Sequence, residues 1–349
     1  MSGPHPATAA VRSAVRACLD ECDPGDLVLV ACSGGADSLA LAAALAFEAP
    51  KRGLRTGAVV VDHQLQQGSA AAARRAADQC LALGLGSADV VRAEVVPTGA
   101  GPEAEARDER YAQLVAASGG ARLVLLGHTR DDQAEQVLLG LARGAGARSL
   151  AGMPRARGRF RRPLLGVTRE QTRASCHAEG LSWWDDPMNQ DPAFLRVRAR
   201  RALADLERDL GPGVRDALAR SADLLREDAD HLDALADQAV RTLTSLGRGA
   251  DAEDAPRPFH IDPGDLSALP RAVRTRVWRR LLVAAGAPAG QVGTRHTDAC
   301  DALVTRWHGQ GPVHVPGDLR VARSGGRVSI TPAPPLEWHR TPARADQEQ

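Results

Sequence analysis

The chain has 349 residues, of which 44% are hydrophobic and 25% are charged, and its formal net charge is +1. This length is typical of two globular domains, and the composition excludes an intrinsically disordered chain. The longest apolar run, Leu39–Phe47, is far too short to cross a bilayer, and residues 1–21 lack the apolar core of a secretory signal, so we expect a cytoplasmic protein without a membrane partner.

Apolar runs alternate with helical patterns over the first 141 residues. Strands are predicted over 26–32, 56–62, 89–96 and 122–126, and helices over 8–20, 38–48, 70–83, 103–117 and 131–141. This alternation predicts right-handed β-α-β units and a doubly wound parallel sheet. Ligands of such sheets bind at the carboxyl ends of the strands.

The pattern changes after residue 150. Residues 153–173 carry seven arginines and one acid, and residues 195–201 form a second arginine cluster. A long helix is predicted over 214–246, a polar linker over 247–258 and a small α+β domain over 259–335. We therefore predict an N-terminal catalytic domain (1–210), a helical linker (211–255), a C-terminal substrate-binding domain (256–335) and a disordered tail (336–349).

The hexapeptide Ser33-Gly34-Gly35-Ala36-Asp37-Ser38 follows the first predicted strand and opens a helix. Two adjacent glycines let the backbone turn tightly and approach an anion, at which the helix points its free N–H groups. The hydroxyls of Ser33 and Ser38 add donors. Asp37 would repel a phosphate unless Mg²⁺ bridges its carboxylate and the phosphate oxygens. The loop lacks the Gly-Lys-Ser/Thr of a kinase-type P-loop, so a different phosphate-binding loop is indicated.

The fourth predicted strand ends at His128, and acids follow it in the first turn of a helix. Asp131, Asp132 and Glu135 could simply cap that helix. Beside His128, however, adjacent acids facing the phosphate loop could hold a metal or orient charge. We predict that Asp37 and Asp132 hold the metal.

The end of the second predicted strand carries another candidate pair. Asp62 and His63 close that strand, where their backbone could read the edges of adenine, although His63 could also merely pack.

A third group lies on one face of a predicted helix. Glu103, Arg107 and Arg110 are spaced for mutual contact, which would suit a surface ladder of ion pairs. The other interpretation is that this face lines the mouth of an active site. Glu103 could then hold a cationic amine, and the arginines could bind phosphate or RNA.

The two arginine clusters are nearly free of acids although the chain as a whole is almost neutral. Segregated arginine suits phosphodiester binding, so we expect contacts with nucleic acid from 153–173 and from Arg196 and Arg198. Trp183 and Trp184 could stack on an unpaired base, but core packing is the simpler interpretation.

The hexapeptide resembles the signature of the N-type ATP pyrophosphatases, which cleave ATP between its α and β phosphates and adenylate a carbonyl oxygen. An ordered series of further segments resembles the tRNA(Ile)-lysidine synthetase family; these are 61–65, 103–111, 127–135, 143–153, 162–165, 189–200 and 269–330. Five residues depart from the family patterns: Gln66, Thr129, Gln136, Met188 and Val197. The resemblance covers most of residues 25–330.

The resemblance implies an adenine nucleotide alpha-hydrolase-like PP-loop fold and an ATP- and Mg²⁺-dependent ligase. Its substrates would be free L-lysine and a tRNA(Ile) with a CAU anticodon, whose first cytidine is adenylated at C2 and then converted to lysidine. This change shifts codon reading from AUG to AUA and aminoacylation from methionine to isoleucine. The assigned roles are catalytic for Asp37, Asp132, His128 and Arg107, ATP-binding for Ser33–Ser38, Asp62 and His63, and substrate-binding for Glu103, Arg110, Asp131, Arg196 and Arg198.

Two alternatives to this function stay open. A tRNA thiolase would need a persulfide-carrying cysteine or an iron–sulfur cluster, yet the six cysteines form no C-x-x-C motif and Cys32 belongs to a buried strand. A nucleotide-binding regulator would bind ATP without turnover. The sequence also leaves open whether the protein is a homodimer.

Overall fold

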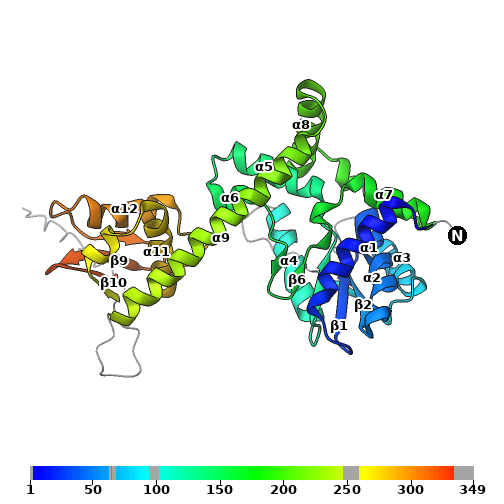
Figure 1. Cartoon of the computed structure of the whole chain (residues 1–349), viewed down its shortest axis with the longest axis horizontal. Helices are drawn as coiled ribbons and strands as arrows, with labels where there is room; N and C mark the ends of the chain where they lie inside the picture. Colours follow the sequence, from blue (N-terminus) through cyan, green and yellow to red (C-terminus); the bar gives the residue numbers. More distant parts are fainter. Residues whose placement is uncertain (1–2, 63, 65–67, 94–101, 247–258, 334–349) are drawn as a thin grey trace, which may run out of the picture. The chain divides into compact units, whose positions relative to one another are not determined.

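The computed structural model describes residues 3–62, 64, 68–93, 102–246 and 259–333. They divide into two compact units, Met1–Arg226 and Glu227–Gln349, whose elements are labelled in Figure 1. The predicted linker at 247–258, the predicted tail at 336–349 and His63 lie outside the described residues. The domain boundaries given above stay predictions.

The first unit contains most of the secondary structure. In chain order its elements are α1 (Pro6–Cys18), β1 (Leu27–Ala31), α2 (Ala36–Glu48), β2 (Arg55–Asp62), α3 (Ser69–Ala82), β3 (Ala88–Arg92), α4 (Pro102–Ala117), β4 (Leu123–Leu126), α5 (Arg130–Ala142), α6 (Ala147–Leu150), β5 (Ala156–Arg157), β6 (Phe160–Arg161), α7 (Arg169–Ala178) and α8 (Leu195–Leu210). Helix α9 (Val214–Leu246) begins in this unit and ends in the second. The strands and helices predicted before residue 142 are confirmed, although β3 ends earlier than expected. Elements α6, β5, β6, α7 and α8 were not predicted.

The sheet of the first unit has the strand order β3-β2-β1-β4-β6-β5. All neighbouring strands pair in parallel except β5 and β6, which are antiparallel. The chain leaves β1 for β2 and β3 on one side and returns to the other side of β1 for β4. The strand order therefore reverses between β1 and β4, which is where doubly wound sheets bind ligands. The predicted doubly wound parallel sheet is confirmed.

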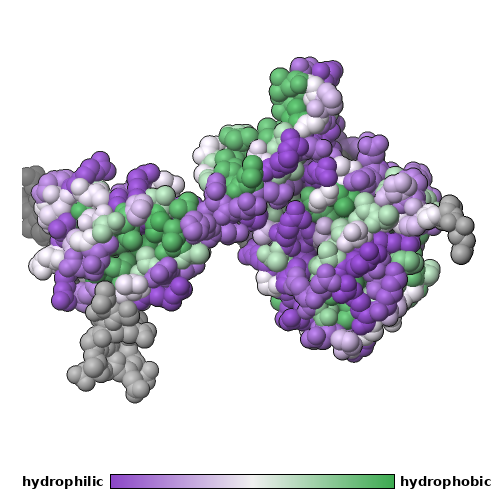
Figure 2. All heavy atoms as spheres, in the orientation of Figure 1, coloured by the Kyte–Doolittle hydropathy of each residue, from purple (hydrophilic) through white to green (hydrophobic). Residues whose placement is uncertain are grey.

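Both faces of this sheet are buried, which explains why its strands are almost wholly apolar. In β1, Val28 and Val30 join a core that also contains side chains of α1, α2, α3 and α7. Leu29, between them, faces the opposite core, to which α4 contributes Leu114. On the side of this unit seen in Figure 2, hydrophilic side chains cover most of the surface.

The carboxyl-terminal end of α2 carries a separate charge cluster. Glu48 is almost fully buried, and its carboxylate accepts hydrogen bonds from the guanidinium of Arg16. Lys51, the only lysine of the chain, lies 3.2 Å from the same carboxylate. Its ammonium group sits 3.5 Å from the ring centroid of Phe47. These contacts lie at the end of α2 opposite the loop Ser33–Ser38.

The second unit is a small α+β fold, as predicted. Its elements are β7 (Phe259–Ile261), α10 (Pro263–Ser267), α11 (Arg271–Ala284), α12 (Thr294–Thr305), β8 (Val313–Val315), β9 (Leu319–Ser324) and β10 (Arg327–Pro332). The strands form an antiparallel sheet in the order β7-β10-β9-β8, and Trp278 of α11 is fully buried in the core beside it. Within the described residues, no helix combines the length and the apolar character that crossing a membrane requires.

Candidate active site

Residues Ser33–Ser38 form the turn from β1 into α2. Gly34 has a φ of +80°, and a Cβ there would lie 3.2 Å from the side chain of Ala76, so only glycine fits without strain. Ser38 braces the loop, because its hydroxyl donates to the carbonyl of Gly35 (2.9 Å) and accepts from the backbone N–H of Ser33 (3.1 Å). The Ser33 side chain is exposed and Ser38 is buried, which leaves Ser33 as the hydroxyl that an incoming ligand can reach.

The amino-terminal end of α2 is open. Within the described part of the chain, no side chain caps this helix at Gly35, so the N–H groups of its first turn remain available as donors. The end of β4 lies directly against the first turn of α2, since a Cβ on Gly127 would be 3.2 Å from the backbone of Ser38. The structure therefore places His128, the next residue, beside the phosphate loop. This is the arrangement of an anion-binding helix terminus at the switch point of the sheet.

The guanidinium of Arg169 lies among three carboxylates. Its Nη2 is 2.7 Å from Asp132 Oδ1, its Nη1 is 3.3 Å from Glu135 Oε1, and its Nε is 3.6 Å from Asp37 Oδ2. Arg169 is the first residue of α7, and its side chain is 18% exposed. Sequence reasoning missed this role because the arginine sits in the segment that we assigned to RNA contact, and its acidic partners lie more than 30 residues away.

The acids at the start of α5 serve as helix caps. Asp132 Oδ2 accepts from the backbone N–H of Thr129 (2.7 Å) and from its hydroxyl (2.9 Å). Asp131 Oδ2 accepts from the backbone N–H of Arg169 at the start of α7 (2.8 Å). The capping interpretation is thus realised for Asp132, whereas Asp131 binds the start of α7 and Glu135 pairs with Arg169 and Arg200. Thr129, which departs from the family pattern, is fully buried as the N-cap residue of α5.

The environments of Asp37 and Asp132 push their pKa values apart. Burial raises the pKa of Asp37 to about 6, although hydrogen bonding from Thr172 and the charge of Arg169 oppose the shift. Burial acts on Asp132 too, but the charge of Arg169 and the hydrogen bonds from Thr129 outweigh it and hold its pKa below the ordinary value. The protein therefore stabilises the ionised form of Asp132 and disfavours the ionised form of Asp37.

A cationic cluster surrounds His128. Burial is the main cause that lowers the pKa of His128 to about 3, and the neighbouring charges of Arg110, Arg162 and Arg196 act in the same direction. Its Nδ1 is buried and has no hydrogen-bond partner among the described residues. His128 is consequently a neutral imidazole with one free ring nitrogen.

Arg107 and Arg110 belong to the same cluster. Both are half-buried on α4, with their guanidinium carbons 5.6 and 5.9 Å from the ring centroid of Tyr111. Burial lowers the pKa of each, and the charges of Arg196 and Arg162 add to this effect. In the described residues neither guanidinium forms an ion pair; because the side chain of Glu103 lies outside those residues, the surface-ladder interpretation stays a prediction.

The remaining predicted residues lie in different settings. Asp62 is buried at the end of β2, where its Oδ1 accepts from the backbone N–H of Gln64 (3.0 Å). Arg198 is exposed, while Arg196 and Arg200 share another face of α8. The side chain of Glu103 is outside the described residues.

The tryptophan pair lies beside the phosphate loop. The backbone N–H of Trp184 donates to the carbonyl of Gly34 (2.9 Å). Trp183 packs against the core and edge-on to His177, as the simpler interpretation expected.

The arginine-rich segment 153–173 is less free than its sequence suggests. Arg161 forms an ion pair with Glu21 (2.6 Å), and the buried Arg162 donates to the hydroxyl of Tyr111 (2.8 Å). Arg155 and Arg157 of the β5 region are exposed. The segment therefore combines structural arginines, whose partners come from distant parts of the chain, with a smaller exposed group.

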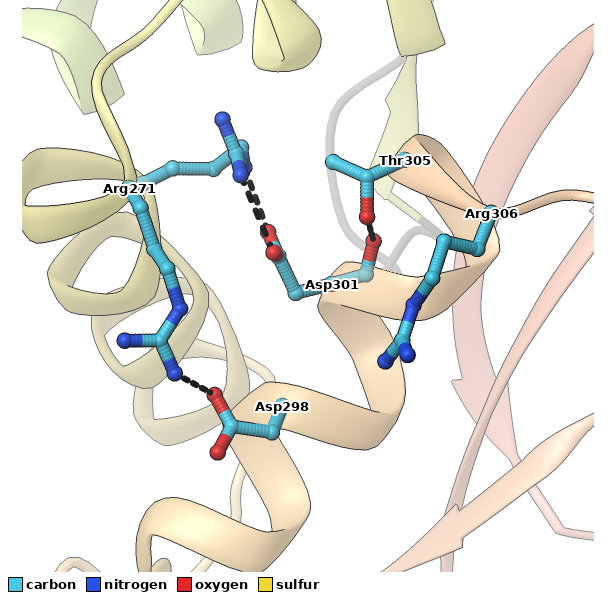
Figure 3. A pocket seen from close by; sticks show the side chains of 6 residues that line it. Arg271, Asp298, Asp301, Thr305 and Arg306 are labelled. Atoms are coloured by element: carbon cyan, nitrogen blue, oxygen red, sulfur yellow. Dashed lines mark hydrogen bonds and ion pairs between the residues drawn. The ribbon is translucent and has the colours of Figure 1, made fainter.

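The second unit has a pocket of about 400 Å³ between α11 and α12 (Figure 3). Arg271 and Asp298 pair at its rim (2.7 Å), and the buried Arg274 pairs with Asp301 (2.5 and 3.0 Å). Arg306 also lines the pocket and is exposed. Two ion pairs and one further arginine give the pocket a net positive charge.

The glycine loop at the switch point of a parallel sheet defines the first unit as a PP-loop domain, and the family model of that domain matches residues 8–207. The model of the TilS substrate binding domain matches residues 263–329. The chain is 52% identical to the tRNA(Ile)-lysidine synthase of Thermobifida fusca (strain YX) over 95% of this chain and 99% of that protein. It is 48% identical to the tRNA(Ile)-lysidine synthase of Streptomyces coelicolor (strain ATCC BAA-471 / A3(2) / M145), over 94% and 99%. The chain belongs to the tRNA(Ile)-lysidine synthase family of ATP-dependent ligases.

A solved structure supports the fold independently. The U34-tRNA thiolase NcsA from Methanococcus maripaludis with its 4Fe-4S cluster is similar over 63% of this chain and 80% of that chain, with a TM-score of 0.54 and 19% identity. This likeness confirms the PP-loop architecture. It carries no information about the reaction.

Proposed function

We propose that this protein joins free L-lysine to C2 of the first anticodon cytidine of a tRNA(Ile) with a CAU anticodon, with release of AMP and pyrophosphate. The observation that supports this most strongly is the family match, which extends over both units at about 50% identity. The open amino-terminal end of α2 beside β4 supplies a place for the polyphosphate of ATP.

The first step is adenylation of the base. The cytidine leaves its stack, because its C2 carbonyl cannot otherwise reach the site. Its oxygen attacks the α-phosphate of ATP, while backbone N–H groups of Gly35–Ser38 and the exposed hydroxyl of Ser33 hold the departing pyrophosphate. Arg107 and Arg110 are desolvated cations without anionic partners in the described structure, so they suit the charge that develops on the phosphate.

The second step is aminolysis. The ε-amine of free lysine attacks the adenylated C2 and displaces AMP, so no residue of the enzyme needs to form a covalent bond. The free ring nitrogen of the neutral His128 could accept a hydrogen bond from the amine and so orient it toward C2, without taking up its proton. Glu103 is the predicted holder of the lysine cation.

Asp37 fits a role as a Mg²⁺ ligand better than Asp132 does. Asp37 Oδ1 accepts from Thr172, but its Oδ2 accepts no hydrogen bond in the described structure and has Arg169 Nε only at 3.6 Å, whereas both oxygens of Asp132 already accept hydrogen bonds. Among the described residues, no three metal-ligating side chains come together. We therefore propose that Asp37 holds Mg²⁺ together with phosphate oxygens, where the ion would neutralise the pyrophosphate. Asp132 as a second ligand stays a prediction.

Two surfaces suit the tRNA backbone. In the first unit, the side chains of Arg155 and Arg157 are exposed and can meet phosphates, although Arg155 also lies 3.6 Å from Asp223. In the second unit, the pocket with Arg271 and Arg306 can receive a phosphate group, which supports a substrate-binding role for residues 256–335.

The test is direct. The purified protein is incubated with ATP, radiolabelled lysine and bulk tRNA, and the tRNA is then digested and analysed for lysidine. Label in lysidine, dependent on ATP and absent from an Asp37→Asn variant, supports the proposal. ATP binding without release of pyrophosphate would instead identify a regulator. Loss of all activity in Cys32→Ala would revive the thiolase alternative.

A further inference from the structure

One arginine joins the two helices that carry the acids of the site. Asp37 belongs to α2 behind the phosphate loop, whereas Asp132 and Glu135 belong to α5 behind β4. Arg169 contacts all three carboxylates, and no other guanidinium in the described chain contacts both helices through these acids. The acids that Arg169 contacts follow β1 and β4, the two neighbouring strands between which the strand order reverses.

The backbone fixes the position of this arginine. Thr168 caps α7 in a reciprocal capping box with Gln171, and Arg169 follows as the first helical residue. The Arg169 N–H donates to Asp131 Oδ2, which ties the start of α7 to the start of α5. One turn later, the hydroxyl of Thr172 donates to Asp37 Oδ1. The first turn of α7, from which the guanidinium projects, is therefore tied to both α5 and α2.

A positive charge is needed where these three carboxylates lie close together. Three carboxylates that share a half-buried site repel one another, and they also repel an incoming polyphosphate. A planar guanidinium presents donors in several directions at once, which an ammonium group cannot do. Glu135, which is 2% exposed, receives a second donor from Arg200 (2.8 Å). Asp37 and Asp132 have only Arg169 as a cationic side chain within ion-pair distance in the described structure.

We propose that Arg169 is a positioning residue of the ligase. It sets the distance between Asp37 and Asp132 and supplies the fixed positive charge that lets the phosphate loop accept ATP beside two carboxylates. This inference rests on the proposed function, because its kcat measurements require lysidine formation. The measurement of nucleotide binding does not require turnover and tests Arg169 separately.

The decisive variants are Arg169→Met, which removes the charge, and Arg169→Lys, which keeps the charge but loses the planar set of guanidinium N–H donors. The matched control is Arg12→Met. Arg12 is as buried as Arg169 (17% and 18% exposed) and pairs with Glu179 at the opposite end of α7. Each variant is assayed well below its melting temperature for binding of α,β-methylene-ATP by calorimetry and for the kcat of lysidine formation.

For Arg169→Met we expect nucleotide affinity to fall about tenfold and kcat to fall about 100-fold, the scale of a misplaced catalytic group. For Arg169→Lys we expect affinity within about threefold of wild type but kcat still reduced at least tenfold, because one ammonium cannot hold both helices. Arg12→Met should lower the melting temperature and leave both quantities unchanged.

Other results would overturn the proposal. Wild-type affinity and kcat in folded Arg169→Met, or equal losses in Arg12→Met, would show a purely structural arginine. If Arg169→Met does not fold, wild-type kcat in Arg169→Lys decides against the proposal. If the wild-type protein forms no lysidine, the proposed function fails, and the calorimetric comparison of the same variants still tests Arg169.

Discussion

The hydroxyl of Thr172 donates a hydrogen bond to Asp37 Oδ1, joining the first turn of α7 to the first turn of α2. The same hydroxyl contacts the carbonyl of Arg169 (2.8 Å), so the carboxylate, the hydroxyl and the arginine form one local network. Asp37 is thus oriented by its neighbours before any nucleotide arrives. Its raised pKa shows that this orientation is achieved against the cost of burying the charge.

Asp37→Asn should separate activity from stability. The amide keeps the shape and can accept from Thr172, but it cannot bind a cation, so we expect adenylation to fall at least 100-fold. The fold disfavours the ionised form of Asp37, so the melting temperature should stay equal or rise. AMP release and thermal unfolding measure the two effects. Unchanged turnover would refute the assignment of Asp37.

His128 should make the protein sensitive to acid. Burial lowers its pKa from 6.5 to about 3, so the unfolded chain takes up a proton that the folded protein refuses. The stability associated with neutral His128 is complete above pH 6.5 and is lost as the pH falls toward 3. In His128→Gln, the loss of stability between pH 7.5 and pH 5 should be smaller by on the order of 1 kcal/mol. Denaturant unfolding at both pH values tests this, and equal losses in the two proteins would contradict it.

Arg155→Glu combined with Arg157→Glu should weaken tRNA binding and flatten its dependence on salt, because each lost phosphate contact reduces the slope by about 1. We choose this pair because both side chains are exposed and the one ion pair, Arg155 with Asp223, lies at the surface, whereas Arg161 and Arg162 are largely buried against their partners. The matched control reverses Arg52 and Arg55 at the start of β2, which three strands separate from β5. This pair also contains one surface ion pair, Arg52 with Asp20, so the structural cost of the two charge reversals is comparable. Filter binding over a series of salt concentrations measures the slope. An unaltered slope would show that the β5 region does not contact tRNA.

Gln133→Leu should destabilise the first unit. Gln133 is buried in α5, where its amide accepts from the N–H of Met153 (2.7 Å) and donates to the carbonyl of Met153 (3.1 Å). Leucine leaves both backbone groups unsatisfied, which should cost about 3 kcal/mol. Gln113→Leu, on the half-exposed side of α4, should change stability by less than about 0.5 kcal/mol. Equal effects in chemical denaturation would disprove the role of Gln133.

The strands and the loop of the first unit could be predicted because their signals are local. Val28–Val30 are continuous apolar residues before a double glycine, and both the strand and the turn follow from that pattern. Helices α7 and α8 escaped prediction because polar residues dominate the sequence of α7 and arginines interrupt the apolar pattern of α8. Their buried residues, such as Thr172, Ser175 and Leu203, are few and partly polar.

The candidate site was harder to predict than the fold. Adjacency of Asp37 and His128 follows from the topology, since both lie after neighbouring strands. The contact between these acids and Arg169 could not be derived from the topology. Arg169 is remote in sequence and resembles the other basic residues of the segment that we assigned to RNA binding. Capping by Asp132 was foreseen as an alternative, but only the contact with Thr129 and Arg169 shows that one carboxylate serves both roles.

The presence of a single lysine, Lys51, has a chemical and a practical consequence. An adenylated base is an electrophile for any primary amine, and this chain carries a single side-chain amine, tethered to Glu48 and Phe47 at the far end of α2. The enzyme therefore presents its reactive intermediate with almost no amine of its own to compete with the incoming amino acid. The same scarcity means that amine-directed dyes would mark one defined side chain, away from the loop.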